Sequence, residues 1–175
     1  ATNQAVHRYL NSRKVPQLLI LSGASRWNDP KNNPYTLSGM FSYEGEGRVY
    51  ARHLLANVKQ PRIAILAQND DFGRDYVRGL KSALGDKAKS MIAAEVTYEV
   101  TDATVDSQLA TLKDSGANVL MNFSTGKFTA QAMTGVQRVG HELLLALDRL
   151  LVGAGSGGRA WVLLCPPQAR PPRLE

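Results

Sequence analysis

The chain has 175 residues, of which 43% are hydrophobic, and its 21 Lys and Arg against 15 Asp and Glu give a formal net charge of +6. This length suits one domain, or one domain with an appended segment. No apolar run approaches the roughly 20 residues of a membrane span, and the single cysteine excludes an internal disulfide and a cysteine-rich metal site. The basic residues are interleaved with acidic ones, which argues against nucleic-acid binding.

The first part of the chain predicts alternating helices and strands. The sequence opens in a helix-like pattern, and no signal peptide is visible. Residues 15–21 (VPQLLIL) form a nearly continuous apolar run, which predicts a strand buried on both faces, as in a parallel sheet. Residues 44–58 have helical spacing, and residues 62–67 (RIAILA) predict a second buried strand.

A helix over residues 74–84 follows a polar turn. Adjacent Asp70 and Asp71 are expected to cap this helix and to complement its dipole, and Gly85 is expected to end it.

The alternation continues to about residue 133. Residues 92–100 alternate in polarity, which indicates an exposed or edge strand. Residues 101–104 offer capping side chains for a helix over 105–115. Residues 118–123 (NVLMNF) predict another strand, with a helix starting near Phe128. This succession predicts an α/β fold with a parallel sheet, whose ligands would lie beyond the carboxyl ends of the strands.

The last segment, residues 134–175, differs in character. It contains Arg but no Lys, holds two Pro-Pro pairs and lacks regular periodicity after residue 152. We expect a separate or disordered segment, produced by a reading-frame change or a truncated gene. Gly153, Gly155 and Gly158 spell G-x-G-x-x-G, but too few residues follow for the helix and second strand of a dinucleotide site.

Catalytic patterns are sparse, so the chain is expected to be neither an enzyme nor a cofactor or metal protein. The three histidines lie far apart, and Cys165 has no neighbour that would lower its pKa. An enzyme related to flavodoxins would need a phosphate loop, which the sequence lacks. The turn at Gly23, Ala24 and Ser25 is a candidate carboxylate site or a plain capping turn. Phe72 and Trp27 are pocket walls or core aromatics.

Three blocks carry a more specific resemblance. In order, they are YLNSRKVPQLLILSGASRWNDP, IAILAQNDDFGRDYVRGLKSALG and YEVTDATVDSQLATLKDSGANVLMNFSTGKFTAQAM. Together they resemble substrate-binding proteins of ABC transporters, of the type I periplasmic, branched-chain amino-acid (leucine/isoleucine/valine) kind. The resemblance covers roughly residues 1–133, and after Met133 the sequence no longer follows the family.

The resemblance implies an incomplete, three-layer α/β lobe of a two-lobed clamp. Residues 1–27 would end the first lobe, 28–40 would form the hinge crossover, and 41–133 would form the second-lobe domain.

The resemblance also implies the site. Ligand contacts would be Gly23, Ala24 and Ser25 in the first lobe, and Phe72, Ser124 and Thr125 in the second.

The implied function is that of a periplasmic solute-binding fragment. It would bind an amino acid or similar small carboxylate weakly, because one wall of the clamp is missing, and it would act with the membrane subunits of an ABC transporter. The alternative is a ligand-sensing receptor domain of the same fold. Apolar surface left uncovered would promote a homo-oligomer, with residues 143–152 as one candidate contact.

Overall fold

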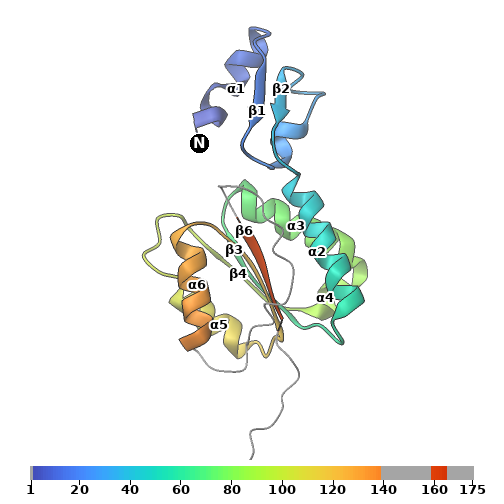
Figure 1. Ribbon diagram of the computed structural model, residues 1–175, viewed down its shortest axis with the longest axis vertical. Helices are drawn as coiled ribbons and strands as arrows, with labels where there is room; N and C mark the ends of the chain where they lie inside the picture. Colours follow the sequence, from blue (N-terminus) through green and yellow to red (C-terminus); the bar gives the residue numbers. More distant parts are fainter. Residues whose placement is uncertain (1, 139–158, 165–175) are drawn as a thin grey trace, which may run out of the picture. The chain divides into compact units, whose positions relative to one another are not determined.

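A computed structural model of the protein describes residues 2–138 and 159–164 (Figure 1). The elements, in chain order, are α1 (Thr2–Ser12), β1 (Gln17–Ile20), the 3-10 turn η1 (Ser25–Asn28), β2 (Thr36–Ser38), α2 (Tyr43–Asn57), β3 (Ile63–Gln68), α3 (Asp71–Leu84), the 3-10 turn η2 (Gly85–Lys87), α4 (Ala88–Met91), β4 (Ile92–Tyr98), α5 (Asp106–Asp114), β5 (Val119–Ser124), α6 (Lys127–Arg138) and β6 (Arg159–Leu164).

The chain divides into two compact units, each described separately below. The first unit comprises Ala1–Lys59 and Gln68–Ala88, and the second comprises Gln60–Ala67 and Lys89–Glu175.

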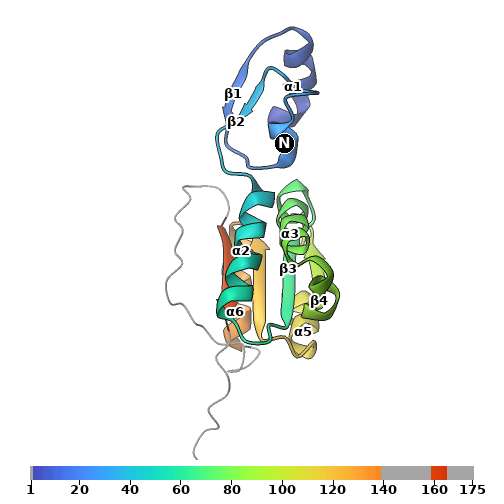
Figure 2. The same cartoon turned by 90° about the vertical axis from the view of Figure 1, so that its right-hand side faces the viewer.

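In the first unit, α2 and α3 pack along each other (Figure 2). Ser42 caps α2 by accepting a hydrogen bond from the Gly45 N–H at 3.3 Å. Asp70 caps α3 through the Gly73 N–H at 3.2 Å, which confirms the predicted capping role of this acidic turn. The helix begins at Asp71, three residues before the expected start, because the cap is Asp70 itself.

The strand predicted over residues 15–21 forms as β1, but its predicted burial on both faces is wrong. β1 pairs in parallel with β2, a strand that the sequence did not predict, and the two make a separate two-stranded sheet. Leu18, Leu19 and Leu21 are 63%, 68% and 77% exposed. Within the described residues no further strand flanks this two-stranded sheet, so its strands are not buried on both faces.

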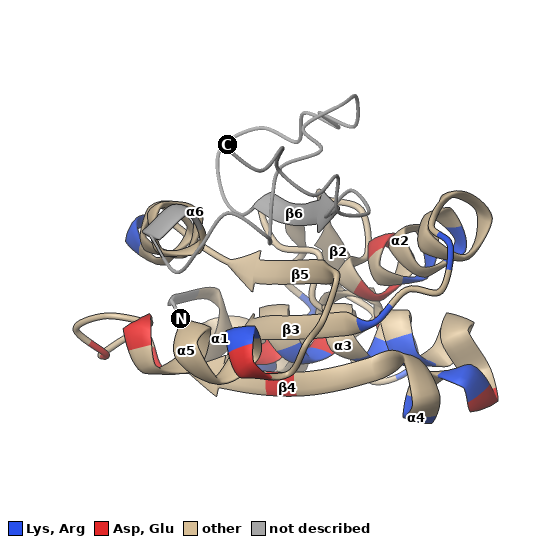
Figure 3. Ribbon diagram, turned by 90° about the horizontal axis from the view of Figure 1, so that it is seen from below, with Lys and Arg blue, Asp and Glu red and all other residues tan. Residues whose placement is uncertain are grey.

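The second unit contains a four-stranded sheet with the order β4-β3-β5-β6. β3 and β5 are parallel, with Ile63 opposite Val119 and Ala67 opposite Phe123. Both strands are buried throughout and carry no charged residue (Figure 3), as expected for central strands. β4 is an edge strand with alternating burial, which confirms the prediction for residues 92–100.

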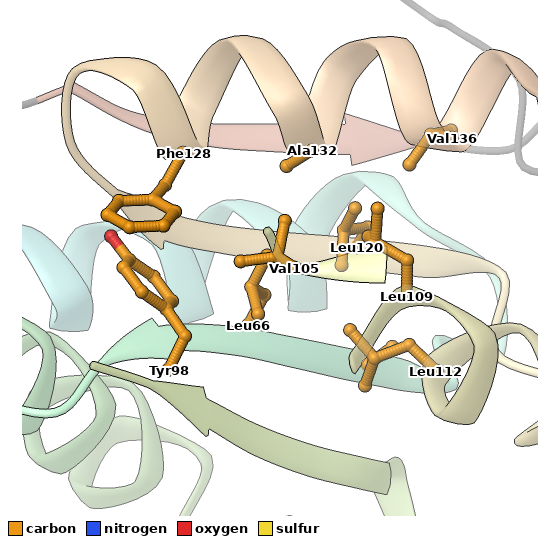
Figure 4. Close-up of a cluster of buried hydrophobic side chains, with 10 residues drawn as sticks. Leu66, Tyr98, Val105, Leu109, Leu112, Leu120, Phe128, Ala132 and Val136 are labelled. Carbon is orange, nitrogen blue, oxygen red and sulfur yellow. The ribbon is translucent and has the colours of Figure 1, made fainter. Parts of the chain in front are cut away.

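The core of the second unit lies where α5 and α6 cover one face of this sheet (Figure 4). Tyr98 of β4 and Phe128 of α6 meet at one end of the core, with ring centroids 4.3 Å apart. The buried members of the cluster are Ala64, Leu66, Tyr98, Val105, Leu109, Leu112, Leu120, Phe128, Ala132 and Val136.

Two further expectations differ from the structure. The residue that caps α5 is Val105, which makes no side-chain cap hydrogen bond, so the expected capping by residues 101–104 is wrong. Val105 takes this position because its side chain is buried in the core. Residues 159–164, expected to be irregular, form β6, antiparallel to β5. Their sequence, RAWVLL, is rich in strand-forming residues.

Several predictions fall on residues outside the described part of the chain. These concern the glycines at 153, 155 and 158, the apolar segment over 143–152, Cys165 and most of the atypical segment over 134–175.

Candidate ligand-binding site

The turn between β1 and η1 holds Gly23, Ala24 and Ser25. A Cβ on Gly23 would lie 2.0 Å from the Phe41 carbonyl oxygen and 2.7 Å from the Tyr43 ring. The Tyr43 N–H donates to the Gly23 carbonyl at 3.0 Å. Glycine is therefore needed here for the close approach of the chain to the start of α2. Ala24 is buried.

Ser25 binds a carboxylate within the chain. Its backbone N–H donates to Asp75 Oδ2 at 2.6 Å, and its hydroxyl donates to Asp75 Oδ1 at 3.3 Å. Arg78 donates to the Ser25 hydroxyl oxygen at 3.1 Å and forms an ion pair with Asp75. In this structure both donors of Ser25 therefore bind the carboxylate of Asp75, and its predicted contact with a ligand stays a prediction.

Phe72 lies in an aromatic cluster of α2 and α3. Its ring meets those of Tyr43 and Tyr76 edge-on, at centroid distances of 5.0 and 5.1 Å. Trp27 of η1 is also buried and meets the ring of His7 edge-on at 5.4 Å. Both aromatic side chains are therefore well packed within the first unit.

A single carboxylate, that of Glu46, accepts hydrogen bonds from two tyrosines beside this cluster. Tyr76 donates at 2.5 Å and Tyr50 at 3.3 Å. Burial, and then the negative charge of Glu46, raises the pKa of Tyr50 to about 12. Burial and the hydrogen bond to Glu46 also raise the pKa of Tyr76. Both phenols therefore stay protonated, as donors, at pH values where an exposed tyrosine begins to lose its proton.

Ser124 and Thr125 belong to the second unit, at the carboxyl end of β5. The Ser124 hydroxyl is 3.0 Å from that of Thr129 on α6. The Thr125 N–H donates to the Tyr98 hydroxyl at 3.2 Å. Asn122, two residues earlier on β5, is fully buried, and neither its amide nitrogen nor its amide oxygen has a hydrogen-bond partner among the described residues.

The candidate residues fall into two groups. Gly23, Ala24 and Ser25 share the first unit with Phe72, and Tyr43 contacts both Gly23 and the Phe72 ring. Ser124 and Thr125 form the second group.

Sequence reasoning did not find the partners Asp75, Glu46 and Tyr98. The only available signal for Asp75 was its position, one helical turn after Asp71 among the buried residues of α3. Within the described part of the chain, no group of three or more His, Cys, Asp or Glu side chains could hold a metal ion.

Comparison with known proteins identifies the family. A family model described as periplasmic binding protein matches residues 1–162. The chain belongs to the periplasmic binding protein family. The match continues past Met133, where the resemblance was expected to end. A search of curated proteins gives no match.

Solved periplasmic binding proteins share the fold. A periplasmic binding protein from Burkholderia mallei is 16% identical, with a TM-score of 0.67 over 79% of this chain and 36% of its own. A branched-chain amino acid ABC transporter protein from Thermus thermophilus, with bound valine, is 17% identical, with a TM-score of 0.65 over 79% and 36%. A fatty acid ABC transporter substrate-binding protein from Thermomonospora curvata is 17% identical, with a TM-score of 0.64 over 80% and 35%.

The chain therefore spans little more than a third of the length of these relatives. Their common fold is mixed α/β with parallel strand pairing, as found here for β1 with β2 and for β3 with β5. Among the helices of the described residues, none is long and apolar enough to cross a membrane.

Proposed function

We propose that this chain is a solute-binding component of an ABC transporter, and that it binds an amino acid or a similar small carboxylate without catalysis. The contact between Ser25 and Asp75 supports this most directly. It brings one N–H and one O–H donor to a single carboxylate, which is the chemistry that a ligand carboxylate would need. The family match and a structural relative with bound valine support the same ligand class.

The proposal assigns a role to each segment. Residues 1–27 end one lobe, 28–40 cross the hinge, and 41–133 belong to the second lobe. Phe72, Ser124 and Thr125 are the proposed second-lobe contacts. The proposed location is the periplasm, and the proposed protein partners are the membrane subunits of the transporter.

A titration with L-valine and with a short-chain fatty acid tests the function. The expected result is weak binding that shifts the backbone amide signals of Ala24 and Ser25 in nuclear magnetic resonance spectra. Ser25→Ala is expected to weaken binding, while Ser12→Ala, an exposed serine on α1, is a matched control. Submicromolar affinity would contradict the expectation that this chain supplies too few ligand contacts for tight binding.

Self-association is a second part of the proposal. Leu18, Leu21 and Phe41 are large apolar side chains that are mostly exposed, and exposed apolar surface favours association in water. Light scattering is expected to show concentration-dependent oligomers, and Leu18→Ser with Leu21→Ser is expected to reduce them. A clean monomer at high concentration would overturn this part.

A further inference from the structure

Asp75 is an acidic side chain placed where the proposed ligand group would bind. It lies on α3, 50 residues from Ser25 in sequence, and is only 3% exposed. Its two oxygens accept separately from the N–H and the hydroxyl of Ser25. Both donors of the proposed carboxylate contact are therefore used within the chain.

An ion pair also connects η1 with α3. Asp71 lies one turn before Asp75 on α3 and forms an ion pair with Arg26, the neighbour of Ser25. Arg78, one turn after Asp75 on α3, joins Asp75 to Glu44 of α2, with its Nε 3.1 Å from Glu44 Oε2. Ser25 and Arg26 thus bind the carboxylates of Asp75 and Asp71, which lie on successive turns of α3.

We propose that Asp75 is an internal competitor for the ligand carboxylate at Ser25, so that Ser25 becomes available only when α3 releases it. This inference rests on the proposed function, because Ser25 is a ligand contact only if the chain binds a carboxylate ligand. A ligand that needs a minor, released state binds with its intrinsic affinity multiplied by the fraction of molecules released. The contact with Asp75 therefore lowers the apparent affinity of the chain for carboxylates.

A purely structural role for Asp75 predicts the opposite change. If Asp75 only held the turn in place, its removal would disorder Ser25 and weaken ligand binding. If Asp75 competes, its removal frees two donors next to the guanidinium of Arg78 and strengthens binding. The direction of the affinity change separates the two roles.

The test uses the full chain labelled with nitrogen-15 and L-valine as the probe. Asp75→Ala is expected to bind valine at least about tenfold more tightly than the wild-type chain, as for a site released in fewer than one molecule in ten. The Ser25 amide signal is expected to move on titration. The double variant Asp75→Ala with Ser25→Ala is expected to lose part of this gain, because it removes the hydroxyl donor and keeps the backbone N–H. Asp86→Ala, an exposed acidic residue of η2, is expected to leave affinity unchanged.

The outcomes are distinguishable. If valine moves the Ser25 amide of the wild-type chain, but Asp75→Ala binds no more tightly, the competition is wrong and the proposed function stands. If the Ser25 amide responds to valine in no variant, the proposed ligand contact fails, and the competition fails with it. Should Asp75→Ala not fold, Asp75→Asn keeps the shape of the side chain, removes its charge and is judged by the same criterion.

Discussion

The strands β1 and β3 have similar apolar sequences but opposite environments. In β1, Leu18 and Leu19 are largely exposed, whereas Ile65 and Leu66 of β3 are fully buried. β3 lies between β4 and β5, but the one strand that pairs with β1 within the described residues is β2. An apolar run therefore predicts a strand, whereas its burial depends on the strands and helices that flank it.

The backbone of the two strands differs as well. Leu19 has a φ of 56°, a left-handed conformation that is unfavourable for a branched residue, and the β1–β2 register shifts between Gln17 and Ile20. β3 instead pairs with β5 through five consecutive positions. The two-stranded sheet is irregular where the four-stranded sheet is regular.

The largest expected effect on stability follows from the difference in burial between β1 and β3. Leu66→Ala leaves a cavity in the core of the second unit and is expected to lower the free energy of unfolding by about 2–5 kcal/mol. Leu18→Ala removes the same atoms from an exposed site and is expected to change the free energy of unfolding by less than about 0.5 kcal/mol. Urea titration followed by circular dichroism measures both. Equal losses would show that β1 is buried in solution.

The comparison also shows what sequence patterns can predict. Spacing of apolar residues identified α2, β3, α3, β4, α5 and β5, because each buries one face or both against its neighbours. β2 was missed because a strand of three residues is too short to show an alternating pattern. The burial of β1 was misjudged because an apolar run does not show how many strands will flank it in the sheet.

The candidate site was only partly predictable for a related reason. Residue type and position at a strand end singled out Ser25, but Asp75 is 50 residues away, and no local pattern links the two. For the same reason, sequence alone could not show that the Thr125 N–H is bound by the hydroxyl of Tyr98.

Helix packing in the first unit provides the next test. A Cβ on Gly79 would lie 2.1 Å from the Glu44 carbonyl oxygen, so Gly79→Ala must push α2 and α3 apart. We expect a loss of about 1–3 kcal/mol in the free energy of unfolding. Gly45→Ala is the matched control, because its nearest contact would be an ordinary 3.6 Å, and it is expected to be neutral or stabilising. If Gly79→Ala were neutral, the helices would be less tightly packed than they are here.

The amide of Asn122 is fully buried in the second unit, next to the apolar strand residues Met121 and Phe123. Because neither of its polar atoms has a partner within the part of the chain that the structure describes, Asn122→Leu is expected to raise the free energy of unfolding by about 1 kcal/mol. Asn118→Leu is the control and is expected to lower it by a similar amount, because the Asn118 side chain accepts from the Arg62 N–H at 2.8 Å. Thermal unfolding measures both. Destabilisation by Asn122→Leu would mean that Asn122 has a polar partner in solution, such as a bound water.

The smallest expected effect concerns the dependence of the first unit's stability on pH. The pKa of Tyr50 is raised from 10.0 to about 12 in the folded chain, so between these values the unfolded chain loses this proton and the folded chain keeps it. The stabilisation that the raised pKa of Tyr50 contributes to folding is therefore fully present below pH 10 and is lost as the pH rises towards 12. Tyr50→Phe is expected to flatten the decline in urea titrations, whereas Tyr9→Phe, at an exposed position, is expected to leave it unchanged. An unchanged slope for Tyr50→Phe would show that Tyr50 is not buried beside Glu46 in solution, and would leave the first unit to be stabilised by packing between its helices.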